Sequence, residues 1–305
     1  MEKLNLQLLF DLCKINRPSD KEYRMVTYIL NYVYKLEGIT IEQDAERNLF
    51  ITKNTTNPET YPVIVAHMDE VFSSTLSKKI KIEGDYISGY NIINNKRQQC
   101  GLGLDDAFGI YCALHLLKRL PNLKVVFTTQ EEMGCIGANE AAYNVEFFAN
   151  VRYMLQADRR GNSDLITHTN GMDVTSDKFL TDIAPLMKKY GYKIARGTMT
   201  DVGTLKEEVH VSACNISCGY YKAHTAKEYG KLSELQKCLN FMYDIVTICT
   251  EVYPHTAQIP VYNYPVQTYP ATTSTNTTPE GFQKYALPCD YCQTFDCARC
   301  NLWYQ

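Results

Sequence analysis

The chain has 305 residues, of which 45% are hydrophobic, and a formal net charge of −3. This length and apolar content suffice for a substantial core. The lack of a basic stripe argues against nucleic acid or an anionic membrane as a partner. No apolar run approaches the ~18 residues that span a bilayer. The first residues also lack the basic segment and apolar core of a signal peptide.

Twelve cysteines are divided between two regions of the chain. Eight occur singly within apolar segments, as expected of buried, reduced thiols. The other four are Cys289, Cys292, Cys297 and Cys300, close to the last residue. This distribution predicts a reduced, cytoplasmic protein with a separate cysteine-rich tail.

Hydrophobic periodicity predicts alternating helices and strands over the first 250 residues or so. Ser19 and Glu22 are spaced as a capping box at the start of the second helix. In chain order, we expect helices over 4–14 and 19–36, strands over 39–43, 47–53 and 61–66, a hairpin over 78–90, a helix from Asp105, strands over 123–129 and 151–157, a helix over 174–190, a strand over 213–221 and a helix over 233–252. This alternation indicates a three-layer α/β/α domain with a mostly parallel central sheet.

The composition changes at residue 254. Residues 254–287 are rich in Pro, Thr and Tyr without periodicity, which is typical of a linker or an extended arm. We therefore predict a folded domain over 1–253, an arm over 254–287 and a cysteine tail over 288–305. The arm and tail suggest docking to another protein or within an assembly.

The tail carries the pattern Cys-x₂-Cys-x₄-Cys-x₂-Cys. Four thiolates at paired Cys-x₂-Cys spacing suit a structural zinc ion. The spacer between the pairs is shorter than in most zinc ribbons, so an iron–sulfur site and a redox-labile tail remain alternatives.

Acidic residues and histidines recur where the predicted core strands end or the Asp105 helix begins. Each has an ordinary structural explanation, such as helix capping for paired aspartates or solvation for a glutamate in a loop. However, the carboxyl ends of parallel strands meet at one edge of a sheet, where ligands bind. The recurrence therefore predicts a common site, formed by His67, Asp69, Asp105, Asp106, Glu131, Glu132, Asp158 and His224.

The order His-x-Asp, Gly-x-Asp-Asp-x-x-Gly, Glu-Glu-x-Gly, Asp, His resembles the co-catalytic dizinc exopeptidases, clan MH. That group includes peptidase T, the carboxypeptidase G type and the bacterial leucyl and glutamyl aminopeptidases. The resemblance extends over roughly residues 5–250, and residues 44–51 and the glycine turn over 200–203 also fit it. The intervals between the motifs are too short for a lid or a second domain, as in the lidless single-domain aminopeptidase type.

The resemblance implies two catalytic zinc ions, which Co²⁺ or Mn²⁺ could replace. It also implies that Glu131 is the general base, that Asp69 orients His67 and that the Asp105–Asp106 peptide is cis. The metal ligands that it implies are His67 and Asp158 for one ion, Glu132 and His224 for the other, and Asp105 as the bridge between them.

We therefore predict a zinc-dependent exopeptidase, aminopeptidase-like, that acts on peptides or small amides. An amidohydrolase or deacylase acting on N-acyl amino acids is an alternative, and so is a non-catalytic binding protein that retains the fold. Arg159 and Arg160 could hold a substrate carboxylate, whereas Glu70 or Asp201 could hold a free amine. Tyr221, Tyr220 and Thr200 are candidates for stabilising the oxyanion.

Overall fold

The computed structural model describes residues 3–73 and 76–256. These belong to the first of the two units into which contacts divide the chain, Met1–Val261. Among them, no helix is long and apolar enough to cross a membrane. Most of the predicted arm and all four tail cysteines lie outside the described residues.

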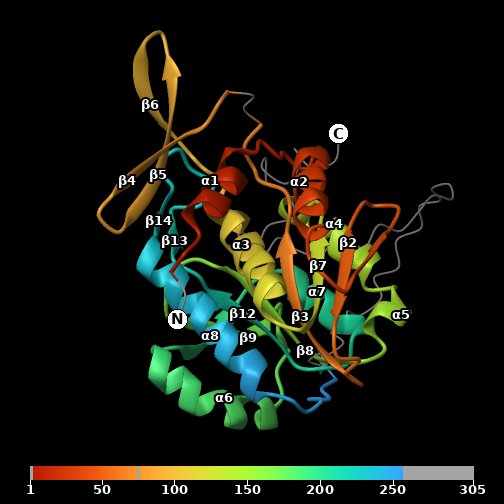
Figure 1. The fold of residues 1–305 in the computed structure, drawn as a ribbon. Helices are drawn as coiled ribbons and strands as arrows, with labels where there is room; N and C mark the ends of the chain where they lie inside the picture. Colours follow the sequence, from red (N-terminus) through yellow and green to blue (C-terminus); the bar gives the residue numbers. More distant parts are fainter. Residues whose placement is uncertain (1–2, 74–75, 257–305) are drawn as a thin grey trace, which may run out of the picture. The chain divides into compact units, whose positions relative to one another are not determined.

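A nine-stranded sheet forms the middle layer of the described part (Figure 1). The four central strands, β7, β3, β8 and β12, are parallel, and antiparallel strands flank them. In spatial order the strands are β1 (Ile39–Gln43), β2 (Leu49–Asn54), β7 (Asn122–Thr128), β3 (Tyr61–His67), β8 (Val151–Arg159), β12 (Ala213–Ser217), β9 (Asp164–Thr169) and β10 (Met172–Asp173), with β11 (Lys193–Gly197) also pairing with β9. The predicted mostly parallel central sheet is confirmed.

Helices cover both faces of this sheet because its central strands are apolar on both sides. In β3, for example, Ile64 and Ala66 join one apolar cluster, whereas Val63 and Val65 join the other. The first cluster packs under α1 (Leu6–Lys14), α2 (Tyr23–Val33), α3 (Leu104–Arg119), α6 (Asp177–Tyr190) and α8 (Leu232–Ile248). The second packs under α4 (Ile136–Ala141), α5 (Val145–Phe148) and α7 (Asp201–Glu208). The three-layer prediction is thereby confirmed.

A second, antiparallel sheet lies beside the first and supplies part of the site. Its strands are β13 (Tyr220–Tyr221), β14 (Tyr229–Lys231), β5 (Tyr86–Ile93), β4 (Lys79–Glu83) and β6 (Lys96–Cys100). Figure 1 shows the β5–β6 ribbon extending away from the helices. The single strand predicted over 213–221 is wrong, since the chain leaves one sheet after β12 and enters the other at β13.

The predicted capping box at the start of α2 is also wrong. Glu22 occupies the N-cap position but makes no capping bond with its side chain. The Ser19 hydroxyl instead donates to Asp69 Oδ2 at 2.7 Å, an acceptor fifty residues further along the chain. The glycine turn expected over 200–203 is likewise replaced by the start of α7, which begins at Asp201.

Eight cysteines lie within the described residues, and all eight are free thiols. Seven are buried, and Cys100 at the end of β6 is half-buried. This agrees with the prediction of buried, reduced cysteines in the folded domain.

Candidate metal centre and active site

The predicted ligands meet at the carboxyl edge of the parallel strands. His67 is the last residue of β3, and Asp158 lies near the end of β8. Glu131 and Glu132 form the short 3₁₀ turn that follows β7 (Glu131–Met133). His224 lies between β13 and β14. Candidate ligand atoms gather within 4.8 Å of one another in three groups, His67–Asp105–Asp158, His67–Glu131–Glu132 and Asp105–Glu132–His224.

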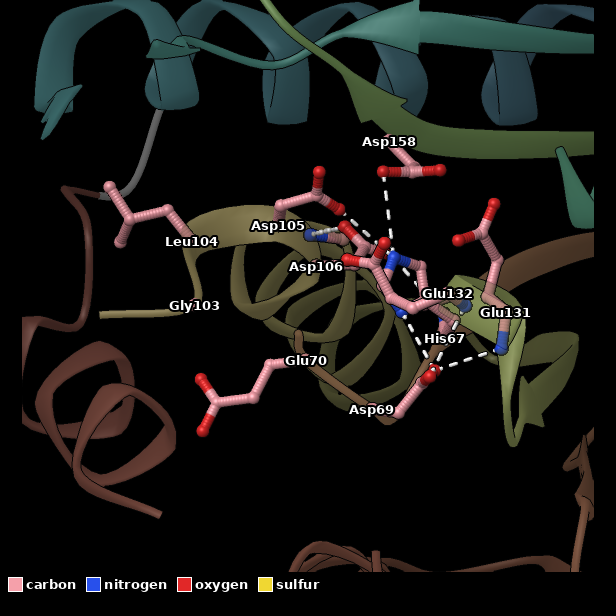
Figure 2. Close-up of polar contacts among 12 residues, drawn as sticks. His67, Asp69, Glu70, Gly103, Leu104, Asp105, Asp106, Glu131, Glu132 and Asp158 are labelled. Atoms are coloured by element: carbon pink, nitrogen blue, oxygen red, sulfur yellow. Dashed lines mark hydrogen bonds and ion pairs between the residues drawn. The ribbon is translucent and has the colours of Figure 1, made fainter. Parts of the chain in front are cut away.

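Asp105 lies between the two histidines. Its Oδ1 is 3.0 Å from Nε2 of His67, and its Oδ2 is 3.2 Å from Nε2 of His224. On the outer sides, Asp158 Oδ1 lies 3.7 Å from His67 Nε2, and Glu132 Oε1 lies 2.9 Å from His224 Nε2. Figure 2 shows the carboxylates of Asp105 and Asp158 beside the His67 imidazole. One carboxylate therefore faces two separate groups of donor atoms.

The backbone that carries Asp105 has an unusual conformation. The Asp105–Asp106 peptide bond is cis, as expected. Asp106 is fully buried and points away from the cavity, since its Oδ2 accepts the His67 backbone N–H at 3.2 Å and its Oδ1 accepts that of Gly109 at 2.8 Å. Asp106 thus ties α3 to the end of β3, while Asp105 projects toward the histidines.

Asp69 connects several parts of the site. Its Oδ1 lies 3.2 Å from Nδ1 of His67, which leaves Nε2 directed at Asp105. The same carboxylate accepts the backbone N–H groups of Glu131 and Glu132, at 3.0 and 3.2 Å. Although burial opposes it, the hydrogen bond and charge of His67 lower the pKa of Asp69. One anionic side chain therefore orients both the imidazole and the glutamate turn.

Glu131 has few partners for its carboxyl group among the described residues. The Cys135 thiol approaches Oε1 at 3.8 Å, and the side chain lines the cavity. Burial raises the pKa of Glu131 to about 10, and the nearby carboxylates of Asp158, Asp201 and Asp105 add to the rise. A cation in the cavity would oppose this repulsion and lower that pKa.

The donor set fits divalent cations because its own charges are not balanced. The carboxylates of Asp105 and Glu132, which are ion-paired with His224, raise the pKa of that imidazole to about 10, and burial raises the pKa of Asp158 to about 8. For His67, burial opposes protonation, yet the surrounding aspartates raise the pKa well above its usual value. Glu132 Oε1 is buried and has no hydrogen-bond partner among the described residues; its 2.9 Å approach to His224 is an ion-pair distance only. The cluster holds protons that metal ions can replace.

A cavity of about 440 Å³ opens over these residues. Its rim carries the cations Arg159, Arg160 and Lys222, and Met199 adds an apolar wall that is 47% exposed. Arg159 Nε lies 3.4 Å from Asp164 Oδ2, in a partly exposed pair that leaves the guanidinium near the cavity. The site thus combines an acidic floor with a basic rim.

Three other predicted contacts lie away from this cavity. Asp201 is fully buried, and its Oδ2 accepts a hydrogen bond from Thr128. The Tyr221 hydroxyl donates to Glu234 at 2.6 Å, outside the residues that line the cavity. Glu70 is buried in ion pairs with Arg17 and Lys78. In Figure 2 the Glu70 carboxylate lies apart from the His67 cluster, on the side of Gly103.

Tyr220, a predicted candidate for stabilising the oxyanion, lines the cavity, and its hydroxyl donates to Asp158 Oδ1 at 3.2 Å. Sequence reasoning missed two other residues that shape the site. Lys222 lines the cavity, and Glu228 follows His224 by only four positions. Proximity to a predicted ligand was the one available signal for both.

Comparisons with known proteins agree with this geometry. Residues 78–241 match the family model of the M42 glutamyl aminopeptidases. Among curated proteins, no match to the sequence was found. The fold is similar to that of a tripeptidase from Staphylococcus aureus subsp. aureus Mu50, with a TM-score of 0.65, 14% identity and coverage of 81% of this chain and 99% of that one.

Two further solved structures share the fold. Aminopeptidase PepT from Bacillus cereus gives a TM-score of 0.64 at 13% identity, covering 81% of this chain and 98% of that one. The TET1 peptidase of Pyrococcus horikoshii, which can assemble into a tetrahedron or a large octahedral shell, gives 0.57 at 17% identity, covering 79% of this chain and 98% of that one. The family match extends over more than half of the sequence, so the chain belongs to the M42 glutamyl aminopeptidase family and is a metal-dependent aminopeptidase of the co-catalytic zinc exopeptidase clan.

Proposed function

We propose that the chain is a dizinc aminopeptidase that removes N-terminal residues from small peptides. The observation that carries this proposal is the position of Asp105, whose two carboxylate oxygens face different histidines. Imidazole and carboxylate donors are typical of catalytic zinc sites. The proposed ligands are His67 and Asp158 for one ion, Glu132 and His224 for the other, and Asp105 for both.

Glu131 is the proposed general base. When bound, two zinc ions supply a nucleophile at neutral pH and polarise the substrate carbonyl. The Glu131 carboxylate lines the cavity, and its side-chain contact among the described residues is the Cys135 thiol. It takes the proton of the attacking water on a carboxylate oxygen and returns it to the leaving amine.

Asp69 positions the residues that do this chemistry. Its bond to Nδ1 fixes the His67 ring so that Nε2 faces the metal-binding side. Its bonds to the Glu131 and Glu132 amides hold the turn that carries the base and a ligand. Such supporting partners usually contribute about 10–100-fold to metal affinity or activity.

The basic rim supports a preference for acidic side chains at the substrate's N-terminal residue. Arg159, Arg160 and Lys222 border the cavity, and their positive charge attracts a carboxylate. The same charges would also accept the carboxylate of an N-acyl amino acid. The basic rim therefore also favours a deacylase as the alternative function.

A substrate comparison separates the two functions. Metal-free protein loaded with Zn²⁺, Co²⁺ or Mn²⁺ is assayed on glutamyl, leucyl and lysyl amides and on N-acetylglutamate. We expect cleavage of the aminoacyl amides, fastest for glutamyl, and a reduced glutamyl preference in Arg160→Ala. Exclusive cleavage of N-acetylglutamate would instead establish the deacylase.

Three further proposals concern the cysteine tail, self-assembly and the cellular location. We propose a structural zinc ion on Cys289, Cys292, Cys297 and Cys300, because four thiolates suit a closed site. We also propose self-assembly, by analogy with the TET1 peptidase shell, and a reducing, cytoplasmic location consistent with the free thiols. Metal analysis should find about three zinc ions per chain and about two in the Cys297→Ser/Cys300→Ser variant. Equal counts would remove the tail site.

A further inference from the structure

Two ligands of one proposed metal site lie on segments that are distant in sequence. Asp105 follows the buried segment Leu102–Leu104, and His224 lies in the loop over 222–228 that joins β13 to β14. The 224–227 part of this loop is exposed, and His224 itself has a side chain that is 49% exposed. Something must hold this loop in register with Asp105.

Glu228 makes that connection. It is only 1% exposed, although the residues just before it are exposed. Its Oε2 accepts the backbone N–H groups of Leu102 at 2.7 Å and Gly103 at 2.8 Å, and its Oε1 accepts that of Leu104 at 3.0 Å. One carboxylate therefore binds the three residues that precede Asp105.

The carbonyl side of the same segment is held separately. Arg17 Nη2 donates to the Gly103 carbonyl at 2.6 Å, and Lys78 Nζ donates to that of Leu102 at 3.2 Å. Loss of Glu228 would therefore leave the segment folded while releasing the loop that carries His224. His224 and Lys222 both have positive φ, a conformation that non-glycine residues retain only when neighbouring contacts enforce it.

We propose that Glu228 is a positioning residue that fixes His224 relative to Asp105 and thereby sets the affinity of the Asp105–Glu132–His224 metal site. The inference rests on the proposed metal-binding function. The carboxylate is required because both of its oxygens accept N–H groups. A glutamine at this position would place its NH₂ against at least one donor.

The test is a double-mutant cycle on zinc affinity. Metal-free wild type, Glu228→Gln, His224→Ala and the double variant are titrated with Zn²⁺ against a chromophoric chelator. In the wild-type background, Glu228→Gln should weaken binding of one zinc ion by about 10–100-fold. In the His224→Ala background the same change should cost less than about threefold, because there is no longer a histidine to position.

Glu234→Gln is the matched control. Glu234 is also buried, at 9% exposure, and accepts the Tyr221 hydroxyl and Asn162, but it does not contact the Leu102–Leu104 segment. Its zinc affinity should stay within about threefold of wild type. Glu228→Asp keeps the charge but shortens the reach, so it should show the same dependence on His224 and serves if the glutamine variant does not fold.

Hydrogen exchange provides a readout without metal. Exchange of the 102–104 amides should accelerate at least about tenfold in metal-free Glu228→Gln and remain unchanged in Glu234→Gln. Equal affinity losses in both backgrounds, or no loss in either, would overturn the inference while leaving the metal site intact. An unchanged zinc affinity in His224→Ala alone would overturn the ligand assignment, and the inference with it.

Discussion

Two clusters of charged side chains meet at the segment from Leu102 to Asp106, and they differ in charge balance. The ligand cluster contains four carboxylates and two histidines beside an open cavity (Asp105, Glu131, Glu132, Asp158, His67 and His224). The support cluster contains two cations and two carboxylates, each at most 4% exposed (Arg17, Lys78, Glu70 and Glu228). The excess of acidic groups in the ligand cluster favours the binding of metal cations, whereas the balanced charges of the support cluster hold the backbone in place.

Asp105, the proposed shared ligand, gives the largest expected effect. Asp105→Ala removes the carboxylate that faces both histidines, so both zinc ions should bind more weakly and aminopeptidase activity should fall by more than about 10³-fold. This exceeds the 10–100-fold typical of supporting residues because a direct ligand is lost. Zinc titration and kcat/KM measure it. Asp106→Ala is the control and should retain at least one zinc ion; normal binding of two ions by both variants would refute the metal site.

Substitutions of the adjacent residues Glu131 and Glu132 should distinguish the proposed general base from the proposed metal ligand. Glu131→Gln cannot accept a proton but keeps its size, so kcat should fall by ~10²–10⁴ with both zinc ions retained. Glu132→Gln replaces a proposed metal ligand, so added Zn²⁺ should partly restore its activity. Metal content and kcat at low and saturating Zn²⁺ distinguish the two. Rescue of Glu131→Gln but not of Glu132→Gln would mean that the roles are reversed.

Stability of the metal-free protein should distinguish the clusters directly. Glu70→Gln removes the partner of Arg17 and Lys78 and leaves buried cations unpaired, which should cost about 3 kcal/mol of unfolding free energy. Asp158→Asn removes a carboxylate from the unbalanced cluster and should raise the unfolding free energy. Urea denaturation with a chelator present measures both. If both substitutions destabilise equally, charge balance does not separate the clusters.

The smallest expected effect is a pH dependence at His224. Its pKa is raised to about 10, above the usual 6.5 of an unfolded chain, by the ion pairs with Asp105 and Glu132. Its contribution to stability is therefore fully present below about pH 6.5 and is lost as pH rises toward 10. The stability advantage of metal-free wild type over His224→Ala should shrink across that window.

Saturating zinc should reverse this trend, because the neutral imidazole is the form that binds metal. The advantage of wild type over His224→Ala should then grow between pH 6 and pH 8. Denaturation curves at matched pH values, with chelator or with Zn²⁺, give both slopes. A flat difference without metal would show that His224 is not ion-paired in solution.

Much of the fold and most residues of the ligand cluster could be predicted from the sequence. Strand-length apolar runs marked β3, β7 and β8, and the residues at their ends proved to lie together. Local pattern failed where partners are distant. The local pattern predicted Ser19 as a helix cap, but its hydroxyl donates a hydrogen bond to the buried carboxylate of Asp69. Glu228 acts on amides 125 positions away at Gly103, which no local spacing encodes.

Short elements were also missed for a physical reason. β13 and β14 have two and three residues, too few to show a period of two. The family resemblance predicted a glycine turn over 200–203, yet Gly203 lies inside α7. There a Cβ would lie 2.6 Å from Thr169 Oγ1. Close packing, rather than backbone freedom, explains the glycine.

The alkylation rates of the free thiols can report on local opening of the structure. Cys100 is half-buried and ends β6, two residues before the first amide held by Glu228. Burial raises its pKa, so alkylation should be slow until the strand end separates from its neighbours. The seven buried thiols of the folded part should react only when the core opens. Peptide-resolved alkylation rates would thus time the release of the Asp105 segment separately from global unfolding.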